Sequence, residues 1–583
     1  MLLLATFSQA ATLTVGPSGT YATIADAEAA TADGDVLELE ALTWYEDLRP
    51  AGRSLTYSST GGVIAGATGD PCLDVTGGSV VVRGLTFDGC ARAMRVEGAT
   101  LTVDGVTVED GSCDAGCALY ADGATVDVTT STFRGNVATS GGGAVYSAAT
   151  TLSLDGVEIS DNAAGESGGG IYATGDVTLT DVELSGNHAG DYGGGGYFSG
   201  AHAYGLVVSG GEIAGNTSGA DGGGLYVNDY EPVEIDGAVF EDNVSSGYGG
   251  GLFVHGNYSL TTRIAGVYLV GNRAGSYGGG LWTQYGADLE VASAVVSENY
   301  AGVGAGGIGS TDSSVTLDGV LLVENDGGGP GGGLYVSGAS SVEARNVTAA
   351  CNTASRDGAG FHLSATTIRL DATVSANNVG GDGYWIGGSL TAYDTIAYSN
   401  GHLGWDGVGS PVGSNDNENF DPGFRGVVCD GSALGDDVAP VIGSRLVDRW
   451  ASGTDVDGSV GDGGAYGGAY GDLDADRDGW GYWDGDCDEG DPAINPGETE
   501  VWYDGVDQDC DERDDDQDGD GYVYAADCDD TAADVSPAGV EVWYDGVDQD
   551  CDGNDDDQDG DGYALADDCD DTTAEVSPAV AEV

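Results

Sequence analysis

The chain has 583 residues, in which 98 acidic side chains face 16 basic ones, giving a net charge of −82. This charge excludes nucleic acid as a partner and disfavours anionic membranes and polyanionic glycans unless cations bridge them. Divalent cations are the partners that the composition favours, and the 106 glycines, many of them in a repeat, indicate one elongated domain with a tail.

The chain opens with MLLLATFSQAA, an apolar run followed by a small-residue cleavage pattern. We expect residues 1–10 to be a signal peptide whose beginning is missing; the alternative is an ordinary first strand. No stretch reaches the roughly 18 apolar residues of a transmembrane helix, so no membrane-spanning segment is expected. These features predict a secreted, extracellular protein, located at a bacterial cell surface.

Residues 11–60 combine a strand, a short helical stretch from Thr23 to Ala32 and a second strand. The order resembles the entry segment of pectate-lyase-like β-helix proteins, in which a helix covers the first coil. An end coil without a cap would expose strand edges and core to water, so we interpret this segment as an N-terminal cap.

Residues 61–400 are expected to form coils of about 27 residues. The last glycine before an apolar residue recurs at regular intervals from Gly143 to Gly360. A second mark keeps the same period, at Asn136, Asn162, Asn187, Asn216, Asn243, Asn272, Asn299, Asn325 and Asn352. Two independent marks in phase indicate a solenoid, in which each unit buries its apolar face against its neighbours.

The strand pattern decides which solenoid this is. Val177, Leu179, Val182 and Leu184 alternate with polar residues, the two-residue period of a strand with one buried face. The fold class predicted is therefore all-β, a parallel β-helix. Equivalent residues of successive coils would lie about 4.8 Å apart, so the asparagines can hydrogen-bond from coil to coil at a turn that tolerates left-handed backbone. Glycine is expected where the chain bends or where coils approach too closely for a Cβ.

The segments GGGIY, GGGLY and GGGLF, with Phe133-Arg-Gly-Asn136 and Phe240-Glu-Asp-Asn243, resemble the paired motifs of polymorphic outer-membrane protein repeats. That resemblance implies a right-handed β-helix of the pectate-lyase type on a cell surface, with an adhesive role. Residues 401–471 are expected to cap the last coil, because Asp455 to Gly467 resembles the closing segment of many secreted bacterial right-handed β-helix proteins.

The composition changes at Asp472, where the first of three copies of an Asp-rich unit begins, and these repeats occupy residues 472–583. The third copy stops at SPAVAEV, so either the chain is a fragment, which we favour, or the gene ends within a repeat. Cysteines of an exported protein are read as disulfides. The expected pairs are Cys72 with Cys90, Cys113 with Cys117 and, within the repeats, Cys487 with Cys510 and Cys528 with Cys551. Cys351 and Cys429 have no obvious local partners.

The second unit contains a calcium-loop pattern. Carboxylates stand at loop positions 1, 3, 5 and 12, glycine at position 6 makes the sharp turn, and position 7 offers its carbonyl. The candidate ligands are Asp516, Asp518, Asp520, Tyr522 and Asp527, with Gly521 at the turn. The third unit repeats the pattern with Asp557, Asp559, Asp561, Tyr563 and Asp568. Oxygen-only ligands favour Ca²⁺, with Mg²⁺ or another divalent ion as the alternative.

The first unit departs from the pattern. Asp476 and Asp478 keep the frame, but Trp480 replaces the third Asp, and Asp486 and Asp488 flank the closing position of a loop one residue shorter. We expect a weaker or differently arranged site there.

The whole unit, with D-x-D-G-D-G-Y, D-C-D-D and D-G-V-D-Q-D-C-D, resembles the metal-binding repeat of many bacterial surface proteins. A second D-x-D-x-D-G frame at Asp548, Asp550, Asp552 and Gly553 would complete a neighbouring site. The opposing interpretation is a disordered acidic tail, which the fixed period of Cys, Trp502 and Trp543 disfavours. Each unit is poor in apolar residues, so a metal and a disulfide are the expected staples.

A catalytic set is missing from the sequence. The five histidines, His188, His202, His255, His362 and His402, are scattered, and the motifs of polygalacturonase-like β-helix enzymes do not occur. Arg263, Arg345 and Arg369 could serve pectate-lyase-like chemistry, but nothing singles them out. We expect a non-catalytic adhesive or structural surface protein, whose ligand would be a surface polysaccharide or a protein receptor. The alternative is a polysaccharide lyase or hydrolase, which an acidic and basic cluster in a groove on one strand face would favour.

Overall fold

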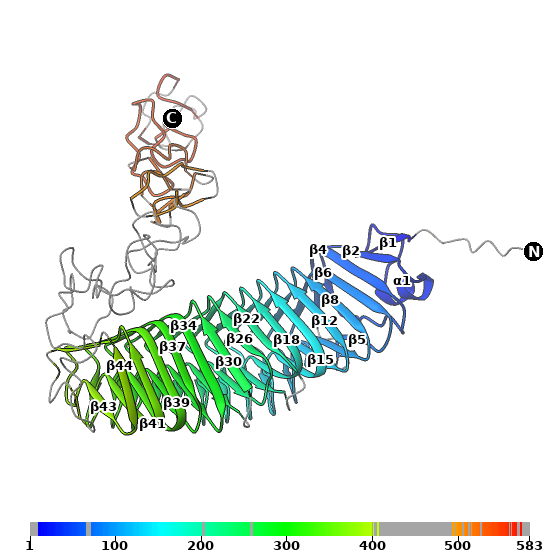
Figure 1. The fold of residues 1–583 in the computed structure, drawn as a ribbon. Helices are drawn as coiled ribbons and strands as arrows, with labels where there is room; N and C mark the ends of the chain where they lie inside the picture. Colours follow the sequence, from blue (N-terminus) through cyan, green and yellow to red (C-terminus); the bar gives the residue numbers. More distant parts are fainter. Residues whose placement is uncertain are drawn as a thin grey trace, which may run out of the picture. The chain divides into compact units, whose positions relative to one another are not determined.

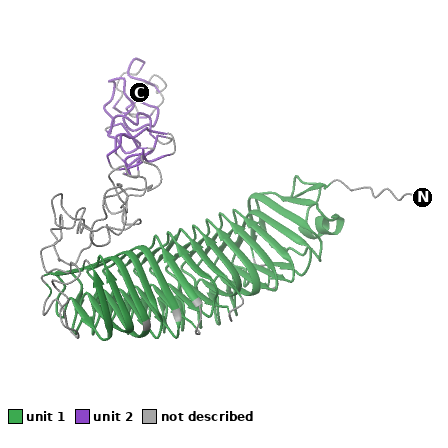
Figure 2. Cartoon of the chain, in the orientation of Figure 1, with its two compact units in different colours: residues 1–471 green, residues 472–583 purple. Residues whose placement is uncertain are grey.

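In a computed structural model, the chain divides into two compact units, Met1–Gly471 and Asp472–Val583 (Figure 2). The structure describes residues 10–406 except 66–70, 201–203, 257–259, 394, 399 and 401–404, and residues 493–573 except 496, 504–505, 511–512, 515, 520, 525–526, 534, 559, 561–562 and 568–571. Nearly all of the expected signal peptide and of the expected C-terminal cap at 401–471 lies outside the described residues.

Residues 12–398 form a parallel β-solenoid of about 14 turns, in which each coil pairs with the coils before and after it (Figure 1). The parallel pairing begins with β1 (Thr12–Val15), which pairs with β2 (Val36–Leu39). Helix α1 (Ile24–Ala30) forms within the predicted Thr23–Ala32 stretch, because the Thr23 side chain accepts a hydrogen bond from the Asp26 N–H at 3.1 Å.

Each full coil contributes strands to four columns, and every column runs in parallel register. The first column follows the glycine run and contains β5 (Leu73–Val75), β7 (Met94–Glu97), β11 (Leu119–Asp122), β21 (Gly196–Ser199), β25 (Leu225–Asn228), β29 (Leu252–His255), β33 (Leu281–Gln284), β36 (Ile308–Thr311), β43 (Tyr384–Ile386) and β46 (Trp405–Asp406).

The second column contains β1, β2, β6 (Ser79–Asp88), β8 (Thr100–Asp104), β12 (Thr125–Thr129), β22 (Leu206–Ser209), β26 (Val233–Asp236), β30 (Leu260–Ala265) and β44 (Ser389–Tyr393). Long strands continue through more than one column: β4 (Leu55–Ala65), β6, β15 (Val145–Asp155), β18 (Ile171–Thr180), β34 (Ala287–Ser297), β37 (Val315–Val323), β39 (Leu334–Ala350) and β41 (Phe361–Asp371).

The third column contains β3 (Thr43–Trp44), β9 (Thr107–Glu109), β13 (Thr132–Arg134), β16 (Glu158–Ser160), β19 (Glu183–Ser185), β23 (Glu212–Ala214), β27 (Val239–Glu241), β31 (Tyr268–Val270), β42 (Val374–Ala376) and β45 (Ile396–Tyr398). The fourth column is a separate 10-stranded sheet of two-residue strands: β10 (Ser112–Cys113), β14 (Val137–Ala138), β17 (Ala163–Ala164), β20 (His188–Ala189), β24 (Thr217–Ser218), β28 (Val244–Ser245), β32 (Arg273–Ala274), β35 (Tyr300–Ala301), β38 (Asp326–Gly327) and β40 (Thr353–Ala354).

The core of the solenoid is the stack of inward aliphatic and aromatic side chains. The four residues predicted to face inward in one unit, Val177, Leu179, Val182 and Leu184, are buried, with at most 3% of their surface exposed. The predicted alternation is therefore confirmed. Burial of such columns is what stabilises one coil against the next.

The predicted asparagine ladder is confirmed and longer than expected. From Asn136 to Asn400, each ladder asparagine donates its backbone N–H to Oδ1 of the asparagine one coil later. Asn378 and Asn400, which the sequence reading did not include, extend the ladder by two coils. The left-handed residue of the turn is the one before the asparagine, as at Asp161 with φ +55° before Asn162.

Two positions explain the glycine run. Gly168 has φ +71°, a left-handed conformation that other residues adopt at a cost. At Gly169 a Cβ would lie 2.2 Å from the carbonyl oxygen of Gly194 in the next coil. The expected close approach of coils is therefore confirmed at Gly169.

A column of aromatic side chains follows the outer surface of the first strand column. Tyr120, Tyr146, Tyr172 and Tyr197 stack with ring centroids 5.0–5.2 Å apart. The column continues through Tyr226, and near Phe253 and Trp282 a second row of tyrosines covers it. The tyrosine that follows the glycine run in these coils thus packs successive coils together, because the face of its ring stacks on the aromatic ring of the next coil.

The predicted disulfides Cys72–Cys90 and Cys113–Cys117 are present in the solenoid. Cys351 is also disulfide-bonded, although the sequence showed no local partner for it. Among the described residues, no helix is long and apolar enough to cross a membrane.

Candidate metal centre

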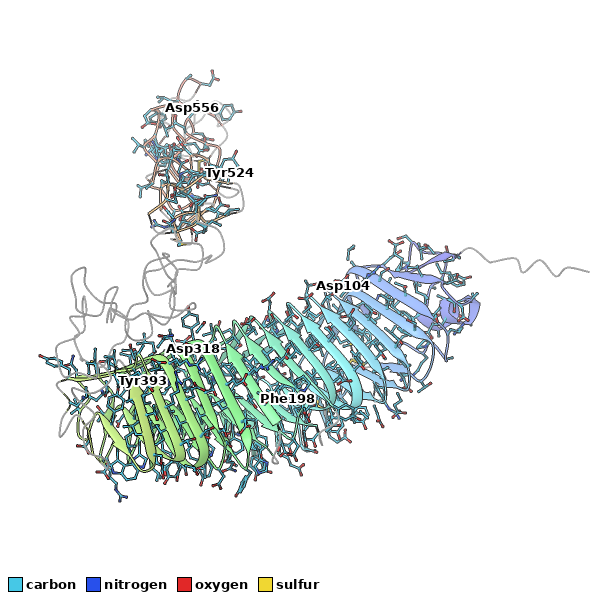
Figure 3. The ribbon with its side chains drawn as sticks, viewed as in Figure 1. Asp104, Phe198, Asp318, Tyr393, Tyr524 and Asp556 are labelled. Atoms are coloured by element: carbon cyan, nitrogen blue, oxygen red, sulfur yellow. A yellow bond between two sulfur atoms is a disulfide. The ribbon has the colours of Figure 1, made fainter. Side chains whose placement is uncertain are left out.

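The C-terminal unit repeats its backbone geometry from one sequence repeat to the next. The N–H of Asn495 donates to the carbonyl of Gln508 at 2.8 Å, and at the equivalent positions of the following repeat Ser536 and Gln549 make the same bond at 2.8 Å. The two copies therefore fold alike, and the geometry of one informs the other. Figure 3 shows the side chains of this unit, including the labelled Tyr524 and Asp556.

The predicted disulfide Cys528–Cys551 is present and joins two cysteines of the same copy of the repeat, 23 residues apart. Cys510 is also disulfide-bonded. Cys429, Cys487 and Cys569 lie outside the described residues. A disulfide reduces the conformational freedom of the unfolded segment, and this stabilises a small repeat that has few apolar residues of its own.

The Asp516 loop is held by its first carboxylate. Asp516 Oδ1 accepts a hydrogen bond from the N–H of Gly519 at 2.8 Å, and Oδ2 accepts one from Gly521 at 3.0 Å. Gly521, at loop position 6, has φ +94°, as expected of the glycine that makes the turn. The Asp557 loop is held in the same way, since Asp557 Oδ1 accepts from the N–H of Gly560 at 2.9 Å.

The structure describes only part of the predicted ligand set. Asp516, Asp518, Tyr522, Asp527, Asp557 and Tyr563 are described, whereas Asp476, Asp478, Asp486, Asp488, Asp520, Asp559, Asp561 and Asp568 lie outside the described residues. Within the described part, Asp516, Asp518 and Asp527 do not form a set of three whose oxygens all lie within 4.8 Å of one another. The complete loops, which need the central Asp, remain a prediction.

Two sets of three carboxylates do come together, and they are equivalent copies. One carboxylate oxygen from each member lies within 4.8 Å of the others in the sets Glu500, Asp507, Asp509 and Glu541, Asp548, Asp550. Each member of the second set occupies the position in its repeat that a member of the first set occupies in the repeat before. We call these two sets the Glu500 cluster and the Glu541 cluster.

Backbone amides position the glutamate of each cluster. Glu500 Oε2 accepts from the N–H of Gln508 at 2.8 Å and from Asp509 at 3.2 Å. The Gln508 side chain in turn accepts from the N–H of Val501 at 2.8 Å, which closes the short loop between glutamate and aspartates. The same contacts recur in the Glu541 cluster, from Gln549 and Asp550 to Glu541 Oε2 and from Val542 to Gln549.

The remaining oxygen of each glutamate is buried. Glu500 is 8% exposed, and its Oε1 has no hydrogen-bond partner among the described residues. Glu541 Oε1 is likewise buried without such a partner there. Burial raises the pKa of Glu541 above its ordinary value, and the charges of Asp550 and Asp555 act in the same direction, against the two amide hydrogen bonds. A carboxylate oxygen in this setting needs a proton or a cation.

A third grouping has different chemistry. Asp527 lies within reach of the sulfurs of Cys528 and Cys551, but these sulfurs form the disulfide and cannot act as thiolate ligands. Oxygen donors are therefore the candidate ligands of the described part of this unit, and they suit hard cations such as Ca²⁺ and Mg²⁺.

The sequence reading missed Glu500, Asp507, Asp509 and Glu541 and assigned Asp548 and Asp550 only to the completion of a neighbouring site. The signal that could have found them is the unchanged recurrence of E-V-W-Y-D-G-V-D-Q-D in two successive repeats. The site was overlooked because each glutamate stands well before its aspartates in the sequence. It therefore lies outside the calcium-loop pattern, in which every second residue is a carboxylate.

The solenoid offers no comparable cluster of acidic groups among its described residues. Each arginine considered for lyase chemistry is paired: Arg263 with Glu290 at 3.0 Å, Arg345 with Glu343 at 2.5 Å and Arg369 with Asp371 at 2.9 Å. One shallow pocket on β26 and β30 is lined by Glu231, Pro232, Val233, Glu234, Thr261 and Arg263. Its arginine already faces Glu290, so the pocket has no free cationic group among the residues that line it.

Comparison with known proteins bears on the C-terminal region. The family model named Cu-binding MopE, described as "Putative metal-binding motif", matches residues 486–516, 527–557 and 568–583. No curated protein matches the chain. The chain is thus a β-solenoid over residues 12–398 followed by repeats similar to this metal-binding motif at 486–583.

Proposed function

We propose that this is a secreted protein of a bacterial cell surface, a right-handed β-helix with an adhesive or structural role, whose C-terminal repeats bind Ca²⁺. The solenoid would present a surface polysaccharide or protein receptor with a long regular face, in the manner of the polymorphic outer-membrane protein repeats that it resembles. Mg²⁺ or another divalent ion is the alternative cation.

The observation that carries the cation proposal is the loop shared by Asp516 and Asp557. Each carboxylate caps its own loop through a backbone amide at 2.8–2.9 Å. Asp516 and Asp557 are also the last residues of two segments, 486–516 and 527–557, that match a motif described as metal-binding. The name of that family refers to copper. Copper sites favour imidazole, thiolate or thioether donors, whereas the described acidic groups here supply oxygen, so Ca²⁺ fits these residues better.

Calcium titration of the full chain by calorimetry tests this proposal. Asp516→Ala combined with Asp518→Ala should remove about one bound ion and leave the Asp557 loop intact. The exposed residue Glu498 provides a charge-matched control, because Glu498→Gln removes a carboxylate that belongs to neither loop. Unchanged stoichiometry and affinity in the double variant would refute the role of the Asp516 loop.

The second candidate function is a polysaccharide lyase or hydrolase on the solenoid, with the shallow pocket lined by Glu234 and Arg263 as its candidate location, although Arg263 is paired with Glu290 there. Reducing-end and unsaturated-product assays on a panel of polysaccharides distinguish the two. Steady turnover that falls in an Arg263→Ala variant would overturn the non-catalytic proposal.

A further inference from the structure

We propose that the Glu500 and Glu541 clusters are a second class of Ca²⁺ site, separate from the Asp516 and Asp557 loops. The inference deepens the proposed function: all six cluster residues lie outside the loop pattern but inside the matched segments 486–516 and 527–557, and the inference names them as ligands. It stands whether or not the loops bind, because it depends on a different set of carboxylates.

Negative charge converges in both clusters. Three carboxylates each place an oxygen within 4.8 Å of the other two in both clusters. Like charges at this spacing repel and favour protonation of one member, unless a cation lies between them. Three oxygens so placed can provide about half of the six to eight ligands that Ca²⁺ takes, while water and carbonyl groups supply the rest.

The Glu500 side chain has a buried oxygen without a hydrogen-bond partner among the described residues, which is an observation separate from the clustering. The side chain is 8% exposed, its Oε2 is fixed by the amides of Gln508 and Asp509, and its Oε1 is buried without a hydrogen-bond partner among the described residues. Since Oε2 is occupied by the amides, Oε1 is the oxygen left to bind a ligand. Burial of an unpaired carboxylate oxygen is costly, and a cation on that oxygen removes the cost.

The same arrangement occurs in both copies of the repeat. Glu541 has the same two amide donors, the same glutamine clamp and the same buried Oε1 as Glu500. Because E-V-W-Y-D-G-V-D-Q-D recurs unchanged, the two copies make the same contacts. The chain therefore has two equivalent candidate sites, each with a buried glutamate oxygen and two aspartates.

Sensitised terbium luminescence of the full chain tests the inference directly. Tb³⁺ substitutes for Ca²⁺ at oxygen sites, and Trp502 and Trp543 each closely follow a cluster glutamate in the sequence, so excitation of tryptophan should give terbium emission that Ca²⁺ displaces. Glu500→Gln and Glu541→Gln, singly and together, should each lower the emission, and the double variant should weaken Ca²⁺ binding at these sites at least tenfold.

The variants and controls separate this inference from the proposed function. Asp516→Ala with Asp518→Ala should leave the emission from the clusters, whereas Glu498→Gln should change nothing. Asp507→Asn provides a second route to the Glu500 cluster if Glu500→Gln disturbs folding, and far-ultraviolet circular dichroism checks each variant. Emission and Ca²⁺ affinity that are equal in the wild type, the double glutamine variant and Asp507→Asn would overturn the inference, even if the Asp516 loop still binds.

Discussion

Oδ1 of Asn272 accepts two hydrogen bonds from Asn243, one coil earlier, from the backbone N–H at 3.1 Å and from Nδ2 at 2.9 Å. Nδ2 of Asn243 also donates to the carbonyl of Ile213 at 2.6 Å. Both asparagines are fully buried. The Asn243 side chain thus bonds to groups of the coil before it and of the coil after it, so the ladder links neighbouring coils through hydrogen-bonded buried polar groups.

Replacement of Asn243 by Ala should destabilise the solenoid by about 2–5 kcal/mol, because it removes the acceptor of the buried Asn216 backbone N–H and side-chain bonds to Asn216 Nδ2 and to the carbonyl of Ile213. Asn228→Ala is the matched control, since the Asn228 side chain is only half-buried and makes one long bond of 3.3 Å to Ser199. Urea unfolding followed by circular dichroism measures both. Equal effects of the two changes would contradict the role assigned to the ladder.

Gly169→Ala should cost several kcal/mol, because the new Cβ would lie 2.2 Å from the Gly194 oxygen in the adjacent coil. Gly156→Ala distinguishes the steric clash of an added Cβ from the cost of a left-handed backbone. Gly156 has φ +57°, but no atom lies within 4 Å of its Cβ position. Only the conformational cost of about 1 kcal/mol is expected there. If Gly156→Ala proves the more damaging change in thermal melts, the close approach of coils does not explain the glycine run.

Leu225→Asp and Leu252→Asp should each lower the free energy of unfolding by several kcal/mol, because each would bury an unpaired charge in the stacked core. Damage should extend to neighbouring coils, which hydrogen exchange measured by mass spectrometry can locate. Val244→Asp, at a position 38% exposed, is the control and should be nearly neutral. A Leu252→Asp protein that melts like the parent would show that the inward assignment is wrong.

His362 should make the solenoid acid-sensitive. Its ring stacks on Tyr335 at 5.0 Å and Trp385 at 4.1 Å, and burial lowers its pKa to about 4. The unfolded chain has a histidine pKa of about 6.5, so it binds a proton that the folded state does not accept, and stability should fall as the pH drops from about 6.5 to about 4. The loss is up to about 3 kcal/mol.

His362→Phe keeps the stack and removes the titration. Melting temperatures of the two proteins across this pH range should converge toward neutral pH and separate in acid, with the variant the more stable. Parallel pH profiles of the two proteins would exclude the contribution of His362.

The architecture of the solenoid could be predicted from the sequence because the two patterns that determine it, the alternation within a strand and the periodic asparagine, are visible in short segments. Alternation of the kind seen at Val177 and Leu179 identifies the buried face, and a phased asparagine identifies the turn. The ladder was predicted two coils too short because the period shortens at the end of the solenoid, where Asn400 lies only 22 residues after Asn378. The aromatic column escaped notice because its function in packing depends on the coil spacing, which a single coil does not reveal.

The metal centre was less accessible. Loop positions of Asp516 and Gly521 follow from spacing alone, since those ligands are close in sequence. The Glu500 cluster depends on a glutamate brought back to its aspartates by the Gln508–Val501 clamp, and this tertiary contact has no short sequence pattern. Burial of Glu500 Oε1 could not be predicted at all, because polar residues next to it in sequence give no sign of a desolvated pocket.

The most direct test of the account is calcium binding to the unmodified full chain at an ionic strength of about 0.15 M, where diffuse counter-ion association is largely screened. Isothermal titration calorimetry should show saturable, stoichiometric uptake of several Ca²⁺ ions per chain, reversed by a chelator, together with a change in the fluorescence of Trp502 and Trp543. Binding to the folded form alone should also raise the stability of the C-terminal unit with calcium concentration. Weak uptake that never saturates and disappears with added salt would contradict the account.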